Sequence, residues 1–263
     1  MNFDFPLILL CVVVFSGVVT FCDFIYCLCK GERFFEKKKR SVIIDYSRSF
    51  FPVLLLVFAI RSFLFQPYRV PTSSLAPTVL PGDFIFVNQY HYGVRFPVWN
   101  KVIIPDGAPS HGQIALFFYP VNHAFTFVKR VIGLPGDHIS YINKVLYVNG
   151  QKQPQKYIGE VTRLDDFGNL VTYQEYQEDF FGIKHDIFQR ADAPAANFYN
   201  IVVPKGEYFM MGDNRDDSDD SRYWGFVPDS DLVGHALFIW MSWDANSPSW
   251  NDYVRWKRIG NKL

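Results

Sequence analysis

Two long apolar runs lie near the start of the chain. Residues 5–28 form the first run, and residues 49–65 form the second. About 20 apolar residues in a helix cross the hydrocarbon core of a bilayer. Arg61, near the far end of the second run, is long enough to reach the membrane surface. The pattern predicts two transmembrane helices, within residues 1–28 and at residues 49–65, with a loop at residues 29–48 between them.

From residue 66 onward, short apolar runs alternate with turn residues. Asn149-Gly150 is a strong hairpin signal, and no long helical period is present. Closely spaced strands of this kind predict a mainly β fold, an antiparallel β-barrel or sandwich. We assign residues 66–150 and 201–263 to this β domain. Residues 151–200 are more polar and are expected to form an inserted β-rich subdomain.

The charges are distributed unevenly along the chain. The 26 basic and 26 acidic residues cancel overall, which argues against a nucleic-acid partner held by a broad basic face. Residues 30–48, however, contain seven basic and three acidic residues. A basic loop between two apolar runs favours membrane helices over buried core helices. The positive-inside rule then puts residues 29–48 in the cytoplasm and the residues after about 66 on the other face.

Several common functional motifs are missing from the sequence. There is no H-E-x-x-H zinc motif, Walker loop or G-x-S-x-G elbow. The acidic run 213–220 fails the calcium-loop pattern, because Arg215, Ser218 and Trp224 replace a ligand, the glycine and the bidentate Glu. We therefore expect no metal and no cofactor. All four cysteines lie in the first 29 residues, so the β domain is expected to fold without disulfides.

Two segments of the β domain contain candidate reactive groups. Ser74 lies in a Ser/Thr/Pro stretch that would usually be only a loop. Lys129 ends one apolar run and precedes another, a position where lysine commonly protects an edge strand. If the amine is instead buried, its pKa falls. A neutral amine close to Ser74 could then accept the hydroxyl proton.

Three segments together resemble type I signal peptidase, the bacterial leader peptidase of the Ser/Lys protease class. Residues 71–78, Pro-Thr-Ser-Ser-Leu-Ala-Pro-Thr, are similar to the nucleophile segment of that family. Residues 129–137, Lys-Arg-Val-Ile-Gly-Leu-Pro-Gly-Asp, look like a second family segment. Residues 212–228, which begin Gly-Asp-Asn-Arg and end Gly-Phe-Val-Pro, look like a third. The resemblance runs from the two apolar runs to the C-terminal tail.

The resemblance implies a role for each matching residue. Ser74 would be the nucleophile and Lys129 the general base. The hydroxyl of Thr72 and the backbone N–H of Ser74 would form the oxyanion hole, and Ser218 would orient the amine. The remaining matches are a structural ion pair and four residues lining shallow substrate pockets: Asp220 with Arg222, and Tyr68, Val70, Ile85 and Val128.

Two departures from the family pattern concern the nucleophile segment. Leu75 replaces the usual Met, an apolar swap of similar volume that should be tolerated. Thr72 stands where many relatives have Ser, and its hydroxyl can still donate a hydrogen bond.

The function implied by the resemblance is that of a serine endopeptidase anchored in a membrane. It would remove N-terminal signal peptides from exported preproteins that carry small residues at the cleavage site. The chain would be multi-pass in the inner, cytoplasmic membrane, with its catalytic domain on the outer, periplasmic face. Its partners would be these preproteins and the lipid bilayer.

Two alternatives remain open. A membrane-tethered, non-enzymatic β-domain that binds extended peptides would function without Ser74 or Lys129. Self-cleaving repressors also use a Ser/Lys arrangement, but they carry a DNA-binding domain where this chain has two apolar runs. Cleavage of a secretory preprotein by the wild type and by Ser74→Ala distinguishes the peptidase from the binding domain.

Overall fold

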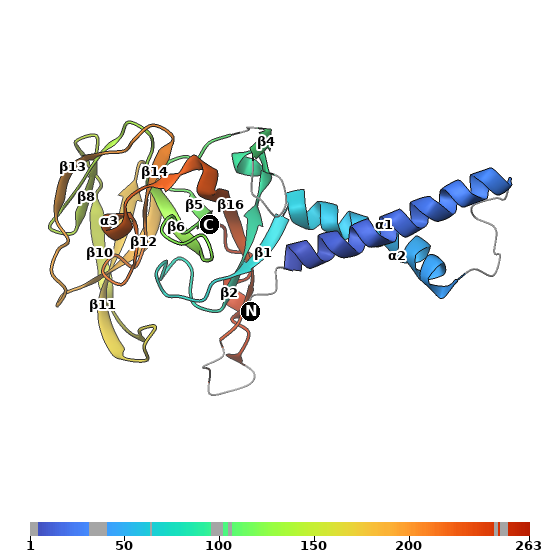
Figure 1. Cartoon of the computed structure of the whole chain (residues 1–263). Coiled ribbons are helices and arrows are strands. Elements are labelled where there is room, and N and C mark those ends of the chain that lie inside the picture. The colour runs from blue at the N-terminus through green and yellow to red at the C-terminus, as the bar shows by residue number, and fades with distance from the viewer. Residues whose placement is uncertain are drawn as a thin grey trace. The chain divides into compact units, whose positions relative to one another are not determined.

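The structure, a computed structural model, describes residues 5–31, 41–63, 65–95, 102–104, 107–244, 247 and 252–263. The chain divides into two compact units. The first comprises residues 1–65 and 95–101, and the second comprises residues 66–94 and 102–263. Two long helices belong to the first unit, and the sheets that carry the candidate site belong to the second (Figure 1).

The two helices of the first unit are α1 (Phe5–Lys30) and α2 (Val42–Phe63). Both are long and apolar enough to span a membrane, over Leu7–Lys30 and Val42–Arg61. Most of their apolar side chains are exposed within the unit. An apolar helix surface of this kind needs either a protein partner or lipid to cover it.

Helix α2 begins before the predicted apolar run, at Val42 rather than residue 49. The additional turns bring Arg48 onto the helix, where its guanidinium lies 3.5 Å from the carboxylate of Asp23 in α1. Further along, α2 packs closely against α1. A Cβ added at Gly17 would lie 2.8 Å from the ring of Phe51. Charge pairing and a small residue at the contact therefore join the two helices.

The β unit is built on a seven-stranded sheet that curls on itself (Figure 1). The pairings recorded between its strands are antiparallel. This confirms the prediction of a mainly β, antiparallel fold. In spatial order the strands are β1 (Phe65–Arg69), β2 (Asp83–Asn88), β16 (Leu232–Ser242), β5 (Ile114–Phe118), β6 (Thr126–Gly133), β14 (Glu207–Met211) and β15 (Val227–Pro228).

Smaller sheets extend this unit. The turn at Asn149 and Gly150 joins β8 (Val145–Val148) to β9 (Gln151–Lys152), and both turn residues have the positive φ that a tight hairpin requires. One sheet has the order β13 (Phe198–Val202), β7 (His138–Ile142), β8 (Val145–Val148) and β9 (Gln151–Lys152). A second consists of β10 (Gln155–Leu164), β11 (Leu170–Phe180) and β12 (Ile183–Arg190), and a third pairs β3 (Val94–Arg95) with β4 (Val102–Ile104).

The segment 151–200 is thus mostly a separate three-stranded sheet. Its last strand, β13, pairs instead with β7 of the neighbouring sheet. The remaining helical pieces of the unit are single turns: η1 (Tyr90–Tyr92), α3 (Ser221–Trp224), η2 (Asp229–Asp231) and η4 (Trp256–Arg258).

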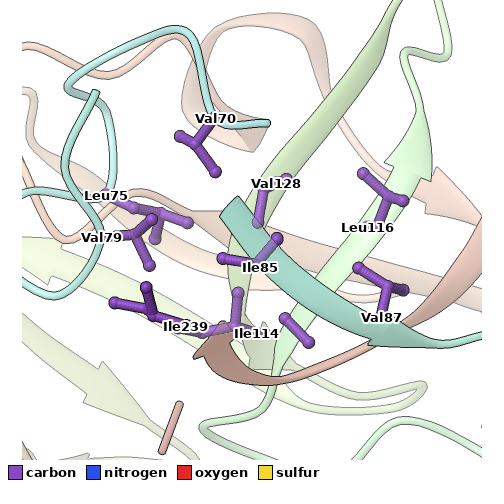
Figure 2. Close-up of a cluster of buried hydrophobic side chains, with 10 residues drawn as sticks. Val70, Leu75, Val79, Ile85, Val87, Ile114, Leu116, Val128 and Ile239 are labelled. Carbon is purple, nitrogen blue, oxygen red and sulfur yellow. The ribbon is translucent and has the colours of Figure 1, made fainter. Parts of the chain in front are cut away.

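A compact apolar cluster packs against one face of the seven-stranded sheet. It joins side chains of β2, β5, β6 and β16 to Leu75 and Val79 of the segment between β1 and β2 (Figure 2). Leu75 is 1% exposed in this cluster. Burial of a Leu side chain stabilises a fold by roughly 1.5–3 kcal/mol. This cluster therefore anchors the segment that carries Ser74.

Candidate active site

A cavity of about 790 Å³ opens in the β unit, and both Ser74 and Lys129 line it. Ser74 belongs to the segment between β1 and β2, whereas Lys129 is part of β6. Segments far apart in the sequence contribute to its wall, including residues 124–129 and 165–167 together with Asp217 and Asp219. The fold therefore brings the two predicted reactive residues to one cavity.

Lys129 is held in a dry environment by its strand. β6 lies between β5 and β14, and Lys129 is opposite Ala115 in the register. The residue is 3% exposed, and its Nζ lies 5.7 Å from the ring centre of Phe127. Burial lowers the pKa of the amine to about 8, although the carboxylates of Asp220 and Asp219 act to raise it. At pH 7 roughly a tenth of the molecules then carry a neutral amine, whereas for a free lysine the share is below about one in a thousand.

Ser218 provides the hydrogen-bond partner of this amine. Nζ of Lys129 donates to Oγ of Ser218 at 3.0 Å, and both residues are buried. Gly212 makes the close approach possible, because a Cβ there would lie 2.3 Å from Oγ of Ser218 and 2.3 Å from the carbonyl oxygen of Ser74. A side chain at residue 212 would thus displace both the base partner and the nucleophile segment.

The hydroxyl of Ser74 is near that of Thr72. The two oxygens are 3.4 Å apart, and Ser74 is half-buried while Thr72 is exposed. Among the described residues, no hydrogen bond joins Lys129 to Ser74, since the amine is engaged by Ser218. Nucleophile–base contacts are often long in structures without substrate.

The backbone of the nucleophile segment is held by hydrogen bonds from a distant loop. The N–H of Asn214 donates to the carbonyl of Ser74 at 3.1 Å, and its side-chain amide donates to the carbonyl of Ser73 at 3.4 Å. Ala76 donates to the same Ser73 carbonyl at 2.8 Å. In the described part of the chain, the Ser74 N–H has no hydrogen-bond acceptor, so it is available to a substrate oxygen.

Asp220 and Arg222 form a buried ion pair. Nε and Nη2 of Arg222 donate to the two carboxylate oxygens of Asp220, each at 2.8 Å. The two side chains are 2% and 0% exposed, so this pair is not a weak surface salt bridge. Asp220 also accepts from the N–H of Gly212 at 3.0 Å. The pair therefore links Asp220, two residues after Ser218, to the backbone of Gly212.

Two further buried ion pairs were not anticipated from the sequence. Arg130, next to the base, donates to both carboxylate oxygens of Asp213, at 2.8 and 2.6 Å. Arg215 is likewise buried and paired with Glu178 of β11. The only sequence signal was that Arg130, Asp213 and Arg215 lie within family-like segments, and Glu178 lies outside them. Nothing local indicates that these charges are buried together. Replacing one partner of such a pair typically costs about 3–5 kcal/mol.

Of the four residues predicted to line the substrate pockets, three line the cavity and one lies behind its wall. Tyr68, Val70 and Val128 line the cavity. Ile85 is fully buried in the same apolar cluster, as Figure 2 shows for Val70, Val128 and Ile85. The phenol of Tyr68 is oriented by Thr126, whose Oγ1 lies 2.6 Å from the Tyr68 oxygen. The wall is thus apolar, with bulky side chains close to the nucleophile segment.

The described residues contain no evident metal site. No group of three or more His, Cys, Asp and Glu side chains there is placed to hold a metal ion. The arrangement that stands out is a hydroxyl and a buried amine of lowered pKa in one cavity. Such a pair is typical of a hydrolase that forms a covalent intermediate.

Comparison with known proteins identifies the family. The model of the family described as "Signal peptidase, peptidase S26" matches residues 43–243. Signal peptidase I of Pseudomonas aeruginosa is 36% identical over 99% of this chain and 99% of its own length. Signal peptidase I of Buchnera aphidicola from Acyrthosiphon pisum is 36% identical over 88% of this chain and 85% of its own. The chain therefore belongs to the signal peptidase family S26.

A solved structure gives a weaker likeness. The signal peptidase I from Enterococcus faecalis is 29% identical and covers 49% of this chain and 96% of its own, with a TM-score of 0.30. The family assignment therefore depends on the sequence matches.

Proposed function

We propose that this chain is a membrane-anchored serine endopeptidase that removes N-terminal signal peptides from exported preproteins. The observation that carries the proposal is Lys129: a buried amine with a pKa near 8, lining the same cavity as Ser74. Membership of the signal peptidase family and relatives named signal peptidase I support the choice of substrate.

In the first half of the reaction, neutral Lys129 takes the proton of Ser74 as Oγ attacks the carbonyl carbon of the scissile peptide bond. The Ser74 N–H and the Thr72 hydroxyl donate to the oxyanion that develops. When the intermediate collapses, the C–N bond breaks and Lys129 returns the proton to the leaving amine. An acyl-enzyme on Ser74 remains.

In the second half, Lys129 takes a proton from a water molecule that attacks the ester. When this second intermediate collapses, the C–O bond to Ser74 breaks and Lys129 returns the proton to Oγ of Ser74. The signal peptide then leaves with a free carboxyl group. Ser218 keeps the amine pointed into the cavity throughout, and the ion pair of Asp220 and Arg222 holds the Ser218 loop in place.

The cavity wall favours small substrate residues. An extended peptide places alternate side chains on the same side, and signal peptides carry small residues at two alternate positions before the cleavage site. Tyr68, Val70 and Val128 leave shallow apolar space that suits Ala better than larger groups, with Ile85 closing the wall behind them.

The two apolar helices would place the proposed active site at the membrane, close to a translocated substrate. Helices α1 and α2 would anchor the chain in the inner, cytoplasmic membrane, with the basic residues between them in the cytoplasm. The catalytic β unit would then lie on the outer, periplasmic face, where the cleavage site of a translocated preprotein emerges.

The test is cleavage of a purified secretory preprotein with Ala at both small positions by the full chain in detergent micelles. We expect the wild type to release the signal peptide and Ser74→Ala to release none, because the attacking oxygen is gone. Ser110→Ala, which removes an exposed hydroxyl elsewhere, serves as the matched control. Cleavage by Ser74→Ala at the wild-type rate would contradict the proposal and favour a binding domain.

A further inference from the structure

The tip of the hairpin formed by β10 and β11 borders the candidate active site. Asp165, Asp166 and Phe167 line the same cavity as Ser74 and Lys129. In Figure 1 this hairpin extends beyond the neighbouring strands of the β unit. The tip lies outside the three segments that resemble the signal peptidase family, so those segments do not account for it.

Asp165 shapes the turn at the tip. One of its carboxylate oxygens accepts the N–H groups of Phe167 at 2.9 Å and Asn169 at 2.8 Å. Gly168 adopts a φ of +84°, a value that glycine reaches without strain. The turn is therefore organised by its own residues, and the side chain of Asp166 remains for a contact outside the hairpin.

That contact is with the nucleophile segment. The N–H of Ser73 donates to both carboxylate oxygens of Asp166, at 2.9 and 3.1 Å, across 93 residues of sequence. Ser73 lies between Thr72 and Ser74, the two residues whose hydroxyls are 3.4 Å apart. Asn214, in another loop, donates to the backbone carbonyls of this segment. Asp166 therefore holds a backbone N–H of the segment, and Asn214 holds its carbonyl groups.

We propose that Asp166 is a positioning residue: its carboxylate holds the Ser73 N–H and thereby sets the relative orientation of the Thr72 and Ser74 hydroxyls during cleavage. The inference rests on the function proposed above. Hydrogen bonds to a charged acceptor are roughly twice as strong as neutral ones. A displacement of about 1 Å in a reacting group can cost about 10²-fold in rate.

The carboxylate also acts on the base through its charge. Asp166 is among the groups that raise the pKa of Lys129. Because Asp166 is exposed, solvent weakens this effect. The hydrogen bond and the charge can be separated, since Asn keeps an acceptor oxygen and loses the charge, whereas Ala loses both.

The experiment compares preprotein cleavage by wild type, Asp166→Ala and Asp166→Asn as a function of pH. We expect Asp166→Ala to lower kcat by about 10- to 10²-fold with little change in KM. Asp166→Asn should restore kcat to within about threefold of wild type. Both variants should move the acid limb of the kcat profile to lower pH, because Lys129 loses a neighbouring negative charge. Glu160→Gln, which removes an exposed charge from the same hairpin, should do neither.

Several outcomes would overturn the role of Asp166. One is a wild-type kcat in folded Asp166→Ala, and another is an Asn variant as slow as the Ala variant. If Asp166→Ala does not fold, Asp166→Leu, which also lacks an acceptor but keeps the side-chain length, takes its place, and a wild-type kcat in that folded variant counts against the proposal. Inactive Ser74→Ala together with fully active Asp166→Ala would remove only this role, whereas active Ser74→Ala would remove the proposed peptidase itself.

Discussion

The two sides of the candidate site are built differently. Lys129 is part of a central strand, is almost fully buried and owes its lowered pKa to that burial. Ser74 and Thr72 belong to a partly exposed segment whose backbone is held by hydrogen bonds from remote residues. The difference implies that changes around Lys129 alter protonation, whereas changes around Ser74 alter alignment.

The largest expected effect comes from removing the neutral amine. Lys129→Arg should lower preprotein cleavage by at least about 10³-fold, because a guanidinium stays charged and cannot act as the base. Thermal unfolding of the variant would show whether the strand still folds. Lys156→Arg, at an exposed position of β10, should cleave like the wild type. Measurable wild-type-like turnover by Lys129→Arg would remove Lys129 from its role.

The second-largest effect is expected at Thr72, the proposed oxyanion donor. Thr72→Ala should lower kcat by about 10²–10³-fold, the usual loss when one such donor is removed. Thr72→Ser keeps the hydroxyl and should recover most of the rate. Single-turnover kinetics with a preprotein would measure the chemical step directly. An unchanged rate in Thr72→Ala would mean that another group stabilises the oxyanion.

A substitution at Gly212 would test the close contact between the Ser74 segment and the Ser218 loop. Gly212→Ala should lower kcat by about 10²-fold, because the new Cβ would push against the Ser74 carbonyl and the Ser218 hydroxyl. Overpacking should also cost about 1–3 kcal/mol of stability, measurable by denaturant unfolding. Gly159→Ala is the matched control, since a Cβ there would have nothing within 4 Å. Equal activity of the two variants would contradict the tight contact.

The smallest effect concerns the charge around the base. Cleavage should rise with pH through a pKa near 8, since only the neutral amine of Lys129 accepts the proton. The carboxylate of Asp219 raises that pKa, so Asp219→Asn should move the acid limb to lower pH. The difference should shrink at high salt, because Asp219 is exposed. A limb displaced to higher pH would reverse the sign of this interaction.

Much of the fold follows from local patterns in the sequence. Alternating short apolar runs and turn residues predicted the antiparallel strands, and Asn149-Gly150 joins β8 to β9. The start of α2 was misplaced, because Arg48 finds its partner Asp23 only when the two helices meet. A charge in isolation indicates a loop, whereas the same charge with a partner can belong to a helix.

The candidate site was predictable only in part. Resemblance to a family pointed to Ser74, Lys129 and Ser218, and the structure brings Ser74 and Lys129 to one cavity and joins Lys129 to Ser218. The pairing of Arg130 with Asp213 and the contact of Asp166 with Ser73 join residues 83 and 93 positions apart. Periodicity and spacing describe neighbours along the chain, so they carry no information about such pairs.

The distances in sequence between the parts of this site have a consequence for biosynthesis. The amine of Lys129 reaches a hydrogen-bond partner 89 residues further along, and β6 pairs with β14, which is made almost as late. A ribosome adds residues at about 5–20 per second, so a growing chain passes several seconds with Ser74 and Lys129 already synthesised and Ser218 still missing. The amine proposed as the general base therefore lacks its hydrogen-bond partner until translation has passed Ser218.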